Sequence, residues 1–237
     1  MKLNQDSIRQ EIKYKIFIKD LPILYAWIYS QSNFRKSYNE RGVNSLYFDT
    51  SKYDFALSNM SGESQRIKIR ARYYSPKGKN AIETFCASGS EFIFELKRKK
   101  NSFSDKLAFG KTKFIQKDSV TRRLSSLSNE LKKYLLNIPS ISNFCLQDTT
   151  LLSYEREYYE HSFCKTIRLT IDKSIFYRKS RPISKANLLS RDYVIAELKF
   201  KPNDIKNVET LMRNFPFRKV RSSKYISAMS QLHRVSY

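Results

Sequence analysis

Four cations stand at every second position between residues 66 and 72 of the sequence. They are Arg66, Lys68, Arg70 and Arg72, and aliphatic or aromatic residues separate them. In a β-strand, side chains two residues apart lie on the same face, so the pattern predicts a strand with one cationic face. Such a face favours carboxylates on neighbouring strands or a bound polyanion, because like charges repel. The alternative is an exposed strand whose charges are solvated.

The same alternation recurs along the chain. Three segments place a glutamate two positions before a lysine, as Glu11 and Lys13 show at the start. The recurrence favours one charged surface built from several strands. The alternating segments are 11–18, 66–74, 92–99, 154–158, 166–174 and 194–201.

These residue types suit phosphoryl transfer without a protein nucleophile. Arg and Lys neutralise phosphate oxygens, and Arg can bind them in a bidentate fork. Carboxylates among the cations can hold a divalent ion that bridges phosphates. Water or another phosphate would then attack in line. The chain has five isolated glycines and no G-x-x-x-x-G-K-[S/T] motif, which argues against a P-loop or kinase mechanism.

The overall charge agrees with an anionic partner. The 45 Lys and Arg residues oppose 22 Asp and Glu residues, a formal net charge of +23. Expected partners are therefore polyphosphate, nucleotides, nucleic acid or an anionic membrane surface. At 41% hydrophobic residues the chain is expected to fold as a globular protein and not as a disordered basic tail.

The sequence argues against several other classes of protein. The longest apolar stretch, residues 21–29, is short and contains Pro22, so no membrane span or signal peptide is expected, and the location is expected to be cytoplasmic. Three cysteines without C-x-x-C spacing argue against a disulfide framework or a zinc site. Two histidines are too few for a histidine-rich metal site.

Helical periodicity separates the strands. Asp20, with Pro22 in the first turn, is expected to cap the first helix, and Ser222 or Ser223 the last. Residues 100–118 are lysine-rich and poorly periodic, and we expect a loop there. The expected helices are 21–28, 119–138, 202–212 and 225–233, with a further strand at 43–49 and turns at 59–62 and 76–79.

The apolar strand faces and the apolar helix stripes fit together in one arrangement. A barrel with an apolar interior would leave every charge outside. A closed antiparallel sheet with helices on its outer, apolar face would instead enclose a charged, water-filled tunnel. The predicted fold is therefore α+β, a closed antiparallel β-barrel flanked by helices, as a single domain over residues 1–237.

Eight short motifs occur in order along nearly the whole chain. They are EIKY at 11–14, SLYFDT at 45–50, KIRARYY at 68–74, FELK at 94–97, YER at 154–156, IRLTID at 167–172, AELK at 196–199 and SKY at 223–225. Together they resemble the VTC domain, the catalytic domain of the vacuolar transporter chaperone polyphosphate polymerase and its bacterial relatives. This family lies within the triphosphate tunnel metalloenzymes, or CYTH-like superfamily.

The resemblance implies an eight-stranded tunnel in which the γ-phosphate of ATP is transferred to a growing polyphosphate chain with Mn²⁺ or Mg²⁺. It implies that Glu197 binds the metal. Glu95 and Glu11 are further metal candidates. Glu197 and Glu95 could instead be salt-bridge partners that keep neighbouring Lys and Arg apart, and Asp172 could either orient an arginine or bind metal. The implied catalytic residues are Lys13, Arg70, Arg72, Lys97 and Arg168, and the implied phosphate- or nucleotide-binding residues are Lys106, Tyr154, Arg156, Lys199, Arg221, Ser223 and Lys224.

Departures from the family pattern bear on the activity. The triphosphatase branch typically begins with E-x-E-x-K, and Arg9 replaces the first glutamate here, which favours the polymerase branch. Hydrolysis of triphosphate or of a nucleoside triphosphate in the same tunnel remains an alternative, as does non-catalytic binding of polyphosphate or RNA. Nucleic acid is the less favoured partner because Tyr73 alternates to the apolar face, where core packing explains it.

Partner chains are a separate expectation. Eukaryotic members of the family carry an inositol-phosphate-sensing SPX domain and membrane helices, and neither is found in this sequence. Coupled export would therefore need membrane-protein partner subunits, with this chain at the inner, cytoplasmic face of the membrane.

Overall fold

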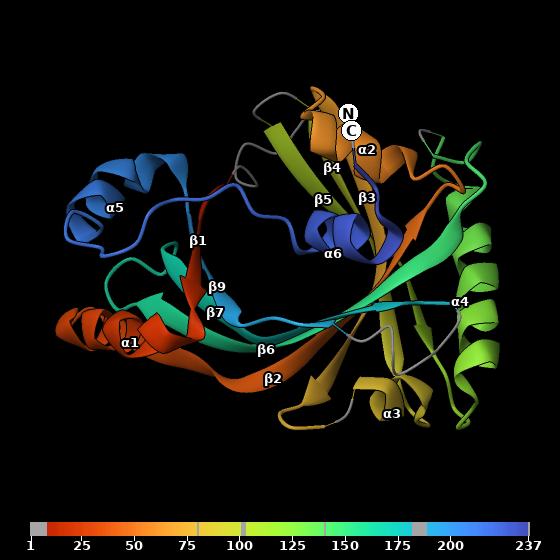
Figure 1. Cartoon of the computed structure of the whole chain (residues 1–237), viewed down its shortest axis with the longest axis horizontal. Coiled ribbons are helices and arrows are strands. Elements are labelled where there is room, and N and C mark those ends of the chain that lie inside the picture. Colours follow the sequence, from red (N-terminus) through yellow and green to blue (C-terminus); the bar gives the residue numbers. More distant parts are fainter. Residues whose placement is uncertain (1–8, 80, 101–102, 140, 182–188, 237) are drawn as a thin grey trace. The chain divides into compact units, whose positions relative to one another are not determined.

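The computed structural model describes residues 9–79, 81–100, 103–139, 141–181 and 189–236. It divides into two compact units, and each unit is assembled from three separate segments of the chain. Unit 1 comprises Met1–Arg41, Tyr154–Ile175 and Ser190–Ser222. Unit 2 comprises Gly42–Ser153, Phe176–Leu189 and Ser223–Tyr237. Figure 1 colours the chain by residue number, from red near the N-terminus to blue near the C-terminus.

The strands belong to one antiparallel sheet of nine strands, in the order β1-β9-β7-β6-β2-β3-β4-β5, with β8 beside β7. The α+β class with flanking helices is confirmed, while closure of the sheet into a barrel and the single domain over 1–237 stay predictions. The strands are β1 (Gln10–Phe17), β2 (Phe34–Asp49), β3 (Gln65–Pro76), β4 (Glu91–Lys100), β5 (Phe103–Lys113), β6 (Gln147–His161), β7 (Arg168–Lys179), β8 (Leu189–Ser190) and β9 (Tyr193–Phe200).

In unit 1, helices α1 (Leu21–Ser30) and α5 (Ile205–Leu211) pack on the apolar face of the strands. Every second residue of β1, β7 and β9 turns toward these helices, as the alternation in the sequence predicts. This core contains Tyr14, Ile16, Leu24, Trp27, Ile28, Tyr159, Ile167, Leu169, Ile171, Val194, Ala196, Leu198, Phe200 and Val208.

The start of α1 differs from the prediction. Asp20 immediately precedes the helix, but in the described structure its side chain makes no capping hydrogen bond. A capping side chain needs an extended backbone at the cap residue. The chain instead enters α1 through a 3₁₀ turn, Ile18–Asp20, which leaves Asp20 at φ −96° and ψ 0°.

In unit 2, helices α2 (Asp54–Ser61), α3 (Ala81–Cys86) and α4 (Val120–Leu135) contribute to a second core with the apolar faces of β3 and β4. Helix α4 confirms the helix predicted over 119–138: Ser119 accepts a hydrogen bond from the Arg122 amide at 3.3 Å and caps it. The α4 leucines that lie in this core are Leu124, Leu127, Leu131 and Leu135.

The loop predicted over residues 100–118 is wrong, because residues 103–113 form strand β5. This strand pairs antiparallel with β4, and the register shifts between Phe94 and Glu95 of β4. Strand β5 is held by its hydrogen bonds to β4. The local sequence pattern of residues 103–113 does not reveal this pairing.

The turn predicted over residues 59–62 is also largely wrong. Helix α2 runs through Ser61, and Gly62, at φ +75°, ends it. The buried Asp49 carboxylate accepts hydrogen bonds from the amides of Phe55 and Ala56, both at 3.0 Å, and so supports the start of α2 from outside the helix. Helix α3 and strand β8 were likewise not predicted. The turn at 76–79 is confirmed by the Lys79 amide, which donates to the Pro76 carbonyl at 3.3 Å.

Helix α6 (Lys224–His233) belongs to unit 2 and lies on the polar side of its strands. Its Tyr225 stacks on Tyr47 of β2, and Thr150 of β6 contacts Met229 and His233. Ser223 caps the helix, which confirms one of the two predicted caps. In the described part of the chain, no helix has the length and apolar composition needed to cross a membrane.

Candidate functional site

The polar strand face of unit 2 carries a row of three lysines. Lys68 of β3 stands opposite Lys97 of β4, and Lys97 stands opposite Lys106 of β5. Like charges directly opposite one another destabilise a sheet, so this row suits a bound anion. We call the surface that contains it the cationic face. Its members are Lys68, Arg70, Arg72, Lys97, Lys106 and Lys224.

Glu95 lies within the cationic face and pairs with three of its members. The carboxylate accepts hydrogen bonds from Arg70 at Nε (2.7 Å) and Nη2 (2.6 Å), lies 3.7 Å from Nη1 of Arg72, and contacts Nζ of Lys106. Burial raises the pKa of Glu95, but Arg70, Arg72 and Lys106 outweigh it and lower the pKa to about 2. The geometry is that of an ion-pair partner, and the proposed metal role of Glu95 stays a prediction.

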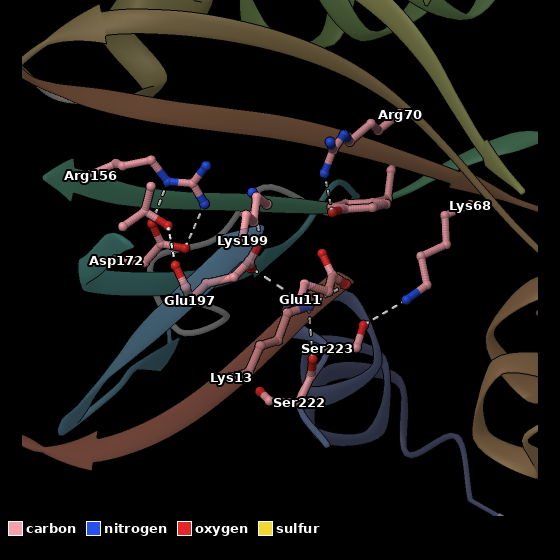
Figure 2. A network of polar contacts seen from close by, with 12 residues as sticks. Glu11, Lys13, Lys68, Arg70, Arg156, Asp172, Glu197, Lys199, Ser222 and Ser223 are labelled. Carbon is pink, nitrogen blue, oxygen red and sulfur yellow. Dashed lines mark hydrogen bonds and ion pairs between the residues drawn. The ribbon is translucent and has the colours of Figure 1, made fainter. Parts of the chain in front are cut away.

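The start of α6 adds a second anion-binding feature to unit 2. The Ser223 hydroxyl accepts a hydrogen bond from the Ile226 amide at 3.4 Å and another from Nζ of Lys68 at 2.9 Å (Figure 2). Lys224 follows at the first position of the helix. Amide groups at a helix N-terminus favour anions, so this arrangement agrees with the predicted phosphate-binding role of Ser223 and Lys224.

Two residues of unit 2 were missed by the sequence analysis as site residues. Lys68 was placed on the cationic strand face but was not assigned a phosphate, although it reaches Ser223. Tyr47 of β2 accepts a hydrogen bond from Nη1 of Arg70 at 3.1 Å. Tyr47 alternates with the core residues Leu46 and Phe48, so its side chain lies on the other face of the strand, together with those of Ser45 and Asp49. This alternation is the signal by which the sequence could have identified it.

In unit 1, the polar face of β1 and β9 carries two carboxylates and two lysines, which we call the carboxylate–lysine cluster. Glu11 stands opposite Lys199, and Lys13 stands opposite Glu197. Nζ of Lys13 lies 3.2 Å from Glu11 and 3.6 Å from Glu197, and Nζ of Lys199 lies 2.6 Å from Glu197. Lys13 also donates to the Ser222 carbonyl at 3.5 Å, so this cluster holds the segment that leads toward α6 (Figure 2).

The carboxylates of the cluster raise the pKa of the Lys13 ammonium group. Burial lowers the pKa of Lys13, but the neighbouring carboxylates of Glu197 and Glu11 outweigh burial and raise it above its usual value. Lys13 therefore stays cationic at neutral pH. Each lysine stands opposite a carboxylate in the register of β1 and β9, whereas in the register of unit 2 Lys97 stands between Lys68 and Lys106.

Arg156 and Asp172 form a bidentate pair in unit 1. Nε and Nη2 of Arg156 donate to the two Asp172 oxygens at 2.6 and 2.8 Å, and Asp172 is fully buried (Figure 2). The guanidinium lies 5.1 Å from the centre of the buried Tyr154 ring. Burial lowers the pKa of Arg156, but Asp172 raises it well above its usual value. Of the two roles considered for Asp172, the structure shows the one that orients an arginine.

Two predicted residues lie outside these groups. Arg168 stands opposite Lys199 in the register of β7 and β9, but its exposed side chain donates to the Lys165 carbonyl at 3.2 Å and lies 3.8 Å from Glu160. Arg221 is exposed and belongs to unit 1, whereas Ser223 and Lys224 belong to unit 2. The catalytic role of Arg168 and the phosphate-binding roles of Arg221, Arg156 and Tyr154 stay predictions.

Two carboxylates of the carboxylate–lysine cluster, Glu197 and Glu11, could hold a divalent metal. The described residues contain no group of three or more His, Cys, Asp or Glu side chains arranged as a metal site. Mg²⁺ and Mn²⁺ in phosphoryl-transfer sites, however, commonly take one or two carboxylates and complete their coordination with water and phosphate oxygens. Glu197 and Glu11, which both lie beside Lys13, can supply that pair.

The sequence matches the model of a known protein family. The model of the VTC domain matches residues 8–233. No curated protein matches the chain.

Several solved structures resemble the fold. They include the PH1819 protein from Pyrococcus horikoshii OT3 (12% identity, 95% of this chain and 98% of that one, TM-score 0.47). The Hippeastrum protein HpAC1, for which a dominant triphosphatase activity is described, has 12% identity over 94% and 96%, with a TM-score of 0.47. A chain of the Schizosaccharomyces pombe Mediator head module has 8% identity over 87% and 95%, with a TM-score of 0.49.

Proposed function

Because this chain belongs to the VTC domain family, we propose that it is a metal-dependent polyphosphate polymerase that uses ATP. The observation that carries the proposal is the row of Lys68, Lys97 and Lys106 across three adjacent strands. A row of like charges suits a ligand with regularly spaced negative charges, and a polyphosphate chain is such a ligand.

In the proposed reaction a terminal oxygen of polyphosphate attacks the γ-phosphorus of ATP. The bond between that phosphorus and the β,γ-bridging oxygen breaks, ADP leaves, and the chain gains one phosphate. The cationic face of unit 2 would neutralise phosphate oxygens, with Arg70 and Arg72 as planar donors and Lys97 and Lys106 as point charges. Positioning and charge neutralisation are what phosphoryl transfer requires of a protein.

In unit 1, Glu197 and Glu11 would hold the divalent metal. When bound, Mg²⁺ or Mn²⁺ supplies charge that neutralises phosphate oxygens. Lys13 and Lys199 would hold the glutamate side chains in place while the metal is absent, because Lys13 already contacts both glutamates and Lys199 contacts Glu197. Arg156, held by Asp172 and lying over the Tyr154 ring, would contribute a rigid guanidinium.

The direct test is to incubate the purified protein with ATP and Mn²⁺ or Mg²⁺, then to separate products on a gel stained for polyphosphate while measuring ADP and free phosphate. Long chains together with ADP support the polymerase. Free phosphate or pyrophosphate without chains supports hydrolysis, the second candidate. Binding of polyphosphate without any turnover supports a non-catalytic binding module.

The metal assignment is tested by Glu197→Gln. We expect turnover to fall on the order of 100-fold or more, because the amide is a poor ligand for a hard cation. Binding of tripolyphosphate without metal should stay within about threefold of wild type, because no cation is removed. Glu209→Gln on the exposed face of α5 is the matched control and should leave both quantities unchanged. Full turnover in Glu197→Gln would show that Glu197 does not bind the metal.

A further inference from the structure

We infer that the Tyr47 hydroxyl donates a hydrogen bond to the phosphate that the cationic face binds, which makes Tyr47 a substrate-binding residue of unit 2. The inference deepens the proposed function and rests on it for the chemical class of the ligand. It starts from one contact: Nη1 of Arg70 donates to the Tyr47 hydroxyl at 3.1 Å. The hydroxyl oxygen is therefore an acceptor, and its own hydrogen is left for another partner.

The surroundings of that hydrogen point to an anion. Tyr47 is 5% exposed, and among the described residues no acceptor takes its hydroxyl hydrogen. The charged groups that act most strongly on the Tyr47 hydroxyl are Arg70 and Arg72 from β3 and Lys224 from α6, and all three are cations. The carboxylate nearest to them, that of Glu95, pairs with the far side of Arg70 at Nε and Nη2. A buried donor without an acceptor is costly, and an acceptor that enters among three cations would be negatively charged. A phosphate oxygen meets both requirements.

The ring of Tyr47 is held in place from its other side. It stacks on Tyr225 of α6, with ring centres 4.4 Å apart and an interplanar angle of 15°. The Tyr225 hydroxyl donates to Asp49 at 2.6 Å, and Asp49 is fully buried. The two stacked rings thus use their hydroxyls differently: that of Tyr225 is satisfied within the protein, and that of Tyr47 faces the cations.

Tyr47 also helps to hold the Arg70 guanidinium in one orientation. Glu95 takes Nε and Nη2 of the guanidinium, and Tyr47 takes Nη1. The plane of Arg70 is thereby set by two partners before any ligand arrives. Preorganised donors of this kind bind phosphate without first having to be ordered.

The test is Tyr47→Phe, which keeps the stacked ring and removes the hydroxyl. Binding of tripolyphosphate is measured by calorimetry without metal or ATP, so that loss of catalysis and loss of this contact are read separately. We expect the dissociation constant to rise about 10-fold, as for a lost hydrogen bond to a charged group. An unchanged constant would overturn the inference, and so would a wild-type chain that does not bind tripolyphosphate.

Tyr73→Phe is the matched control in the same unit. Its hydroxyl is also buried and donates to the Ala81 carbonyl at 2.8 Å, but it lies on the apolar side of β3. We expect Tyr73→Phe to lower thermal stability and to leave the dissociation constant within about twofold of wild type. If both variants weaken binding equally, the effect of Tyr47 is one of stability and the inference fails.

The pH dependence of tripolyphosphate binding separates the two roles of the hydroxyl. A hydroxyl that only supported the structure would not make the affinity difference between wild type and Tyr47→Phe depend on pH. Burial raises the pKa of Tyr47, but Arg70, Arg72 and Lys224 outweigh burial and lower the pKa below its usual value of 10.0. As pH rises through that pKa the donor proton is lost, so the advantage of wild type over Tyr47→Phe should shrink. An advantage that stays constant up to about pH 10 would contradict donation to phosphate.

Discussion

Glu95 is a carboxylate set among the cations of unit 2, and it links two neighbouring strands. Its partners come from β3 (Arg70 and Arg72) and β5 (Lys106), while Glu95 itself lies on β4. The pairing offsets part of the repulsion among these cations and fixes the direction of Arg70. Because the carboxylate is almost fully buried, its protonation state matters to folding as well as to anion binding.

The pH dependence of stability follows from Glu95. Its pKa is about 2 in the folded chain against an ordinary value of 4.5. A lowered pKa stabilises the fold above pH 4.5, and this stabilisation is lost as pH falls from 4.5 toward 2. The difference corresponds to about 3 kcal/mol in the free energy of unfolding. We expect Glu95→Gln to lose about that much at pH 7 and little near pH 2, as measured by urea unfolding at both pH values.

Glu91→Gln is the control for this prediction. Glu91 lies on the same strand and pairs with Lys111, but both side chains are largely exposed. An exposed ion pair contributes little to stability, so the control should unfold like wild type at both pH values. A Glu95→Gln variant whose loss of stability is the same at pH 7 and pH 2 would contradict the lowered pKa.

At the scale of helices and strands, the sequence predicts the elements whose own residues show a clear hydrophobic periodicity. Strand β3 alternates from Arg66 to Tyr73, and α4 repeats leucine at helical spacing, so both were found with nearly correct limits. Strand β5 and helix α2 depend on partners outside their own segments, namely β4 and the Asp49 carboxylate, and both were missed. The cationic and carboxylate residues of the site were found because they lie on well-patterned strands. Tyr47 was not, because its neighbours come from β3 and α6.

The packing of α4 on β5 depends on the absence of a side chain at Gly110. A Cβ atom at this position would lie 2.6–2.7 Å from three ring carbons of Tyr134. We expect Gly110→Ala to lower the free energy of unfolding by about 1–3 kcal/mol, because the ring must move. Denaturant unfolding measures the loss.

The clash can be isolated with Tyr134→Leu. This change removes the ring, although it also removes the hydroxyl that donates to the Lys111 carbonyl at 2.7 Å. In the double variant the cost of Gly110→Ala should be smaller than in wild type, a coupling that a double-mutant cycle measures. Strictly additive losses would show that Tyr134 is not the obstacle.

At the scale of the whole molecule, the net charge of +23 acts on any anionic ligand. Exposed charges are screened by salt, and a ligand that replaces many counterions binds with a steep salt dependence. The side chains of the cationic face include Lys106, which is half exposed. Affinity for polyphosphate should therefore depend on both chain length and ionic strength.

We expect affinity for long-chain polyphosphate to fall about tenfold or more between roughly 50 and 200 mM NaCl. The fall should be shallower for tripolyphosphate, which replaces fewer counterions. Fluorescence or calorimetric titrations at several salt concentrations give the two slopes. Equal slopes for the two ligands would mean that only a few phosphates of the long chain contact the protein.

The division of the chain into interleaved segments bears on how the protein is made. Unit 1 needs residues from Met1–Arg41 and from Ser190–Ser222, and unit 2 needs residues from Gly42–Ser153 and from Ser223–Tyr237. A ribosome builds the chain from its N-terminus, so it has passed residue 189 before the last segment of unit 1 begins to emerge. Helix α6, which carries Lys224 and the ring that stacks on Tyr47, emerges later still. The cationic strands of β3 and β4 are thus synthesised well before the helix that completes their surface, and the nascent chain carries that charge without its final partner.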